Sequence, residues 1–424
     1  AGVPVISLFS HRYDAGQSAD DLRNLRLDLA RMAAAKREGL LVKFITLDKQ
    51  VIWSGEGYQS WLLDSSFLTR QGDVLAGYAS QWRNVLFDVT SEAYLVQRES
   101  ALLRGAFQDW LADHYTNPTE AVERWGLAQE SAPTSFAGLP VPDPAVSLMG
   151  DNWCLNLATV LTLLPEKPVP VQHDYFAFSA SVYDRFYSRL RSVLGPVGKG
   201  NYLTGLSMSG GGRAWPWDTA GSLDVPNSHL YDQLLGLAGG LALDDFRSIN
   251  KPFFAGELGY YDSSYLPPEF QLTSFSEQQR GYYEEAIARA LMRQTAGLLF
   301  WELHDGRNEW QIEKGVESDY GLVSKANEVP KAGFWAVRNA NLLGALTTPR
   351  MRAPQAVLVL PMELINSSYW ALAMHRLRAT ANCLMASGLD FWTVPSTALA
   401  SIPQEAKLVL CPLLWGLSDG EWAA

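Results

Sequence analysis

The sequence predicts an α/β protein: a (β/α)8 TIM barrel, incomplete at its N-terminus, followed by a truncated Rossmann-like α/β domain. Two observations lead to this fold class. Short apolar runs alternate with stretches of helical periodicity, which is the pattern of parallel strands joined by helices. Two of the runs also end in a lone glutamate followed by small or aromatic residues, and parallel barrels place their reactive groups at the carboxyl ends of their strands.

Composition narrows the class of protein further. The 424 residues are 47% hydrophobic and 19% charged, which fits a globular chain with more than one domain. The net charge of −11 argues against nucleic acid or an anionic membrane as partner. Cys154, Cys383 and Cys411 lie far apart without metal-ligand spacing, so no disulfide framework, metal or other cofactor is expected. The sequence leaves the compartment open, with the cytoplasm favoured.

The strands and helices of the barrel follow each other as βαβ units require. Ser18 opens the first helix with a capping-box-like start, and Gly39 ends it. Pro330 is expected in the first turn of the last helix. The expected strands cover 3–9, 40–47, 84–89, 202–208, a run from 222, 251–257 and 297–303; the expected helices cover 18–39, 173–194, 276–295 and 330–346. Since a closed barrel of this type needs eight strands, we expect the first strand and helix to precede residue 1.

The predicted domain boundary lies near residue 350. The barrel domain is expected over residues 1–350, with an insertion at about 95–150 that contains a helix near 106–115. The second α/β domain is expected over residues 351–424. Its predicted strands are 356–360, 391–394 and 406–411, with a helix over 369–385.

Glu257 and Glu92 are the predicted catalytic pair. Each follows an apolar strand, so the two carboxyl groups are expected at the same mouth of the barrel. Cleaving a glycosidic bond needs one acid to protonate the leaving oxygen and one carboxylate to meet the anomeric carbon. Glu257 is also consistent with a salt bridge at the barrel rim, and Glu99 or Asp88 is an alternative to Glu92.

Other side chains at the predicted strand ends suit a sugar-binding site. Burial and a negative neighbour are expected to raise the pKa of Glu92, so that it acts as the acid, while Glu257 stays ionised beside Tyr231 or His229. His229 is equally consistent with a structural histidine. Trp301 is expected to form the floor under the sugar ring. Weaker candidates are His11, Arg12, Glu302 and His304, and the loop tryptophans that suit outer subsites or loop packing are Trp53, Trp61, Trp215 and Trp217.

Three short motifs resemble the clan A glycoside hydrolases, which are retaining enzymes on a (β/α)8 barrel. Residues 85–92 (VLFDVTSE) resemble the strand of the acid/base, 253–257 (FFAGE) that of the nucleophile, and 298–302 (LLFWE) the eighth strand. Within the clan, family 42 β-galactosidases are most similar. Residues 106–115 and 123–126 resemble their insertion, and residues 355–424 resemble the start of their trimerisation domain.

The resemblance implies a retaining, exo-acting β-galactosidase-like enzyme with a carbohydrate substrate. Glu92 would be its acid/base and Glu257 its nucleophile, and the C-terminal domain would form a homo-oligomer. The clan usually places Asn before the acid/base, where it holds the sugar 2-hydroxyl; here that position is Ser91. Two alternatives therefore stay open: another clan A glycanase of mannanase or glucanase type, and a non-catalytic glycan-binding barrel.

Overall fold

The structure is a computed structural model of the 424-residue chain. The residues that it describes are 5–9, 19–46, 62–90, 101–140, 170–197, 200–208, 220–230, 246–260, 275–303, 321–324, 328–346, 353–365 and 370–414.

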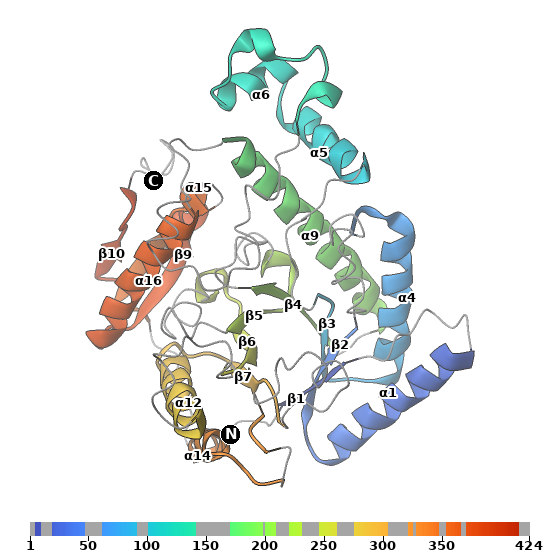
Figure 1. The fold of residues 1–424 in the computed structure, drawn as a ribbon, viewed down its shortest axis with the longest axis vertical. Helices are drawn as coiled ribbons and strands as arrows, with labels where there is room; N and C mark the ends of the chain where they lie inside the picture. Colours follow the sequence, from blue (N-terminus) through green and yellow to red (C-terminus); the bar gives the residue numbers. More distant parts are fainter. Residues whose placement is uncertain are drawn as a thin grey trace.

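In the described part of the chain, seven parallel strands form one sheet and follow each other around it in chain order. The strands are β1 (Val5–Phe9), β2 (Leu41–Ile45), β3 (Val85–Asp88), β4 (Tyr202–Met208), β5 (Val225–Leu230), β6 (Phe254–Leu258) and β7 (Gly297–Phe300). β1 and β7 come close to each other, so the sheet curls into a nearly closed barrel (Figure 1). The structure thus confirms all seven predicted strands and the TIM-barrel fold class.

Helices surround the barrel on its outer face, as Figure 1 shows. They are α1 (Ala19–Arg37), α4 (Ser65–Gln81), α9 (Pro170–Val197), α12 (Phe275–Met292) and α14 (Ala332–Leu346), with short 3₁₀ turns η3 (Ala220–Ser222) and η4 (Arg247–Ile249) before β5 and β6. Asp64 starts α4, because its carboxylate accepts hydrogen bonds from the backbone N–H groups of Ser66 and Phe67. α4 packs along α9, and Gly72 of α4 faces Val193 of α9.

The described part of the predicted insertion, residues 101–140, contains the helices α5 (Ala101–His114) and α6 (Pro118–Arg124) and the 3₁₀ turns η1 (Gln129–Ser131) and η2 (Phe136–Gly138). In Figure 1 they project beyond one end of α9. Asp174 of α9 joins them to the barrel, because its carboxylate accepts hydrogen bonds of 2.7 Å from both the Tyr115 hydroxyl and the Trp125 indole. Its neighbour His173 lies 3.2 Å from the carboxylate of Glu363.

A second parallel sheet follows the barrel, in the order β10-β8-β9. It consists of β8 (Ala356–Leu360), β9 (Phe391–Pro395) and β10 (Leu408–Leu410), with α15 (Met362–Ile365), α16 (Trp370–Ala386) and the 3₁₀ segment η7 (Ser396–Ser401). Side chains of β6 and α12 share one hydrophobic core with β8, α16 and β9. Arg247 and Arg293 add polar anchors, since both guanidinium groups donate hydrogen bonds to the backbone carbonyl of Phe391. The exact domain boundary stays a prediction.

Two local predictions were wrong. Pro330 does not start α14: it pairs with Val323 in an isolated β-bridge, and the helix begins at Ala332. Ser222 belongs to a 3₁₀ turn, so β5 begins only at Val225. The strand continues to Leu230, and Asn227 within it is buried inside the barrel. In the described parts of the chain, no helix combines the length and hydropathy that crossing a bilayer requires.

Candidate active site

Glu257 lies near the carboxyl end of β6, as the sequence predicts. It is the fourth residue of the five-residue strand, and its side chain is partly exposed between buried neighbours. His229 of β5 is its partner in the parallel register. Trp301 directly follows β7, where its backbone N–H donates to the carbonyl of Leu258 at 2.8 Å. The structure therefore brings these three positions together at one end of adjacent strands.

Most of the other predicted site residues lie outside the described residues. This applies to Glu92, Ser91, Arg12, Trp53, Trp215 and Tyr231, as well as the alternatives Glu99, His11 and His304 and the side chain of His229. The pairing of Glu92 with Glu257 consequently stays a prediction, as does the expected pKa difference between them.

Asp88, an alternative to Glu92 as the acid, forms an ion pair inside the barrel. Its carboxylate is fully buried in the barrel and forms an ion pair of 2.9 Å with the ammonium of Lys43, which is fully buried as well. The other carboxylate oxygen accepts a hydrogen bond of 3.2 Å from the backbone N–H of Thr90. Both carboxylate oxygens are thus engaged inside the barrel, and none of the side chain is exposed for contact with a substrate. The arrangement argues against Asp88 as the acid.

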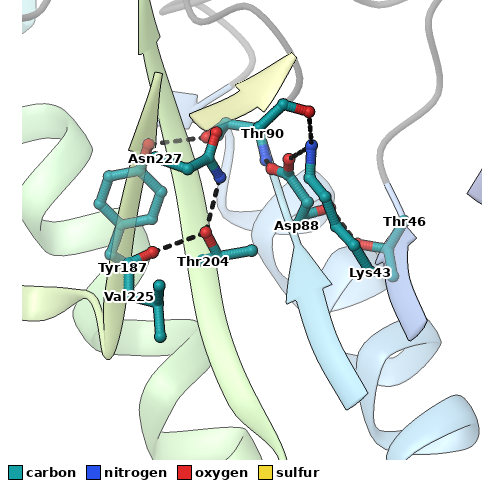
Figure 2. Close-up of polar contacts among 9 residues, drawn as sticks. Lys43, Thr46, Asp88, Thr90, Tyr187, Thr204, Val225 and Asn227 are labelled. Atoms are coloured by element: carbon teal, nitrogen blue, oxygen red, sulfur yellow. Dashed lines mark hydrogen bonds and ion pairs between the residues drawn. The ribbon is translucent and has the colours of Figure 1, made fainter. Parts of the chain in front are cut away.

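Lys43 connects two sides of the barrel interior, and Figure 2 shows its contact with Asp88. It lies in β2 and pairs with Asp88 of β3, and the same ammonium donates a hydrogen bond of 3.2 Å to the carbonyl of Gly256 in β6. Gly256 immediately precedes Glu257. The Lys43 ammonium thus contacts the peptide group that links Gly256 to Glu257, the candidate nucleophile.

A second group of buried polar side chains lies next to this ion pair. The side-chain amide of Asn227 in β5 donates to the hydroxyl of Thr204 in β4 at 2.6 Å. That hydroxyl donates in turn to the carbonyl of Val225 at 2.6 Å (Figure 2). Asn227 also faces Gly256, because a Cβ added to this glycine would overlap the amide oxygen. Only glycine therefore fits at the position before Glu257 with its neighbours as they are.

On the outer face of the barrel, Tyr187 of α9 contacts Thr90, whose backbone N–H donates to Asp88. Its hydroxyl lies 2.7 Å from the hydroxyl of Thr90, two residues beyond the end of β3. Burial raises the pKa of Tyr187, so the phenol stays neutral and available for this hydrogen bond. Gly205 of β4 makes room for the tyrosine ring, since a Cβ there would come within 2.8 Å of it.

The sequence-based search for the site missed Lys43. The signal was present: Leu41–Ile45 is an apolar strand with one lysine in its centre, and a lysine there has to be paired if the strand is buried. Among the residues that the structure describes, no three His, Cys, Asp or Glu side chains are grouped as a metal site requires.

Three β-galactosidases of known structure resemble this chain. The enzyme from the Antarctic haloarchaeon Halorubrum lacusprofundi gives a TM-score of 0.67 at 16% identity over 92% of this chain. The enzyme from Rahnella sp. R3 gives 0.70 at 16% identity over 97%. A catalytic mutant of a family 42 β-galactosidase from G. stearothermophilus gives 0.68 at 12% identity over 99%. The chain shares their TIM-barrel fold.

The match covers only part of each of these proteins: 61%, 62% and 64% of their lengths, in the same order. No protein-family model matches the sequence, and no curated protein matches it. At such low identity, the likeness is one of fold, and the chemistry has to be argued from the residues of this chain.

Proposed function

We propose that the chain is a retaining glycoside hydrolase that cleaves terminal β-glycosidic bonds, as a β-galactosidase does. The observation that carries the proposal is the place of Glu257, a partly buried carboxylate at the carboxyl end of a barrel strand, with His229 and Trp301 on the two neighbouring strands. The fold shared with β-galactosidases supports it.

In this mechanism Glu257 attacks the anomeric carbon and forms a covalent glycosyl-enzyme. Glu92 first protonates the leaving oxygen and then removes a proton from the water that releases the sugar. Trp301 stacks against the sugar ring, which holds the anomeric carbon over the nucleophile. Ser91 contacts the 2-hydroxyl where the resembling enzymes use an amide.

Hydrolysis of a panel of aryl β-glycosides tests the proposal, with galactosides, glucosides and mannosides in parallel. We expect the galactosides to react fastest, Glu257→Ala to abolish turnover, and azide to restore part of the rate of Glu92→Ala. Glu38→Gln is the matched control, because Glu38 is an exposed carboxylate in the turn after α1. Sugar binding without hydrolysis of any aryl glycoside would refute the proposal and indicate a glycan-binding barrel.

A crystal structure tests the stereochemical part separately. The carboxyl groups of Glu92 and Glu257 are expected about 5 to 5.5 Å apart, the separation in retaining enzymes. A separation of about 6.5 to 9.5 Å would leave room for a water molecule and indicate an inverting enzyme.

A further inference from the structure

The ion pair between Lys43 and Asp88 has no role in the chemistry described so far. Both side chains are fully buried, at a separation of 2.9 Å. Removing two charges from water costs several kcal/mol for each ion, and apolar residues of similar size often serve stability as well or better. Burial of this pair therefore calls for a reason other than stability.

The contacts of Lys43 supply that reason. Its ammonium reaches from β2 to the backbone carbonyl of Gly256 in β6, while β3, β4 and β5 lie between these two strands in the sheet. The carbonyl belongs to the peptide that links Gly256 to Glu257. A hydrogen bond donated by a cation is roughly twice as strong as one between neutral groups. This buried contact of 3.2 Å therefore restrains the Gly256 peptide inside the barrel.

The surroundings of Gly256 confirm that its peptide is tightly confined. A Cβ built there would lie 2.9 Å from the amide carbon of Asn227 and 3.1 Å from the ammonium of Lys43. Asn227 is itself held by Thr204. Two restrained side chains thus enclose the residue before Glu257.

We propose that Lys43 is a positioning residue: paired with Asp88, it holds the Gly256 carbonyl and thereby sets the place of the Glu257 carboxylate at the barrel mouth. This inference rests on the proposed function of Glu257 as nucleophile. Asp88 compensates the charge of Lys43, so the pair acts through the geometry of the hydrogen bond and adds no net charge to the site. Lys43 itself does not contact the substrate.

The test compares the wild-type protein with Lys43→Met/Asp88→Asn, which removes both charges and keeps an acceptor for the Thr90 N–H. Rates are measured per folded molecule on two aryl β-galactosides whose leaving groups differ in acidity. A misplaced nucleophile slows formation of the glycosyl-enzyme for both substrates, so we expect kcat to fall about 10²-fold on each. KM should change by less than about threefold, because ground-state contacts with the sugar are retained.

Leu111→Ala is the matched control for a change that only destabilises the fold. It truncates a fully buried apolar side chain of α5, which lies in the insertion and contributes no strand to the barrel. The control should melt at a lower temperature and keep the wild-type kcat. A double variant whose kcat stays within about twofold of wild type would overturn the positioning role while leaving the proposed function intact.

Crystal structures of wild type and double variant give a readout that needs no activity. We expect the main chain at Glu257 to move relative to Trp301 by at least about 0.5 Å, the tolerance of a catalytic constellation. An unchanged position overturns the proposal, whatever happens to the rate. If the wild-type protein hydrolyses nothing, the proposed function fails, and this displacement alone decides whether Lys43 positions Glu257.

Discussion

Replacing Lys43 alone with methionine should destabilise the protein far more than replacing both members of the ion pair. At 2.9 Å and an effective dielectric constant of about 20, the Coulomb attraction is about 6 kcal/mol. The cost of burying the two charges is of the same order, so the pair contributes little net stability. Lys43→Met keeps the cost for Asp88 and removes the attraction. We expect a loss of about 3 to 5 kcal/mol in the free energy of unfolding.

The double variant Lys43→Met/Asp88→Asn removes the cost as well as the attraction. It should unfold within about 2 kcal/mol of wild type, because the neutral asparagine still accepts the hydrogen bond from the Thr90 N–H. Urea unfolding of wild type, both single variants and the double variant gives the four corners of a thermodynamic cycle. The coupling energy should be at least about 3 kcal/mol.

Two results would refute this reasoning. If Lys43→Met lowered the free energy of unfolding by less than about 1 kcal/mol, water would have to reach the ammonium inside the barrel. If the double variant lost as much as the sum of the two single variants, the two charges would act independently and their contact would carry no energy.

Three further predictions concern other parts of the molecule. Gly205→Ala should lower the free energy of unfolding by about 1 to 3 kcal/mol in thermal melts, because its Cβ overlaps the buried Tyr187 ring. The hydrogen bond with Asp174 raises the pKa of His173. Protonated His173 therefore stabilises the fold fully below about pH 6.5, and this contribution is lost as the pH rises through the raised pKa. His173→Gln should flatten the pH dependence of the free energy of unfolding, measured by urea titration between about pH 6 and pH 9. Calorimetry of the full chain should show one transition, and a chain ended at residue 350 should aggregate, because barrel and second sheet share a core.

The strands other than β5 were predictable from the sequence because each is a largely apolar run. β5 has the sequence VPNSHL, which is mostly polar, so its start was misplaced. The helix α4 was not predicted. Its segment contains Gly72 and several Ser and Thr residues, which weaken helical propensity, and its stability comes from Asp64 at its start and from packing against α9. Neither contribution is visible in the local pattern. Pro330 was misleading for a related reason: a proline that suits a helix start also suits the extended bridge that it forms with Val323.

Of the candidate site, the sequence predicted the positions of Glu257 and Trp301 at strand ends, because the end of an apolar run fixes where a strand stops. It did not predict the contact between Lys43 and Gly256. That contact joins strands that are not adjacent, so it depends on the stagger of the barrel, which no local pattern encodes. Lysine in the middle of an apolar strand predicts only that a partner exists.

The contact between Lys43 and the Gly256 carbonyl requires both the buried ion pair and a glycine at position 256. Apolar residues in place of Lys43 and Asp88 would fill the space and give comparable stability. They would offer no hydrogen-bond donor to the Gly256 carbonyl, which now accepts from the Lys43 ammonium. A side chain at position 256 would push Lys43 and Asn227 away and break the same contact. If the double variant proves nearly as stable as wild type and yet slow, the barrel keeps two buried charges because they fix the direction of one peptide. Stability and rate measured on the same variant separate these two roles.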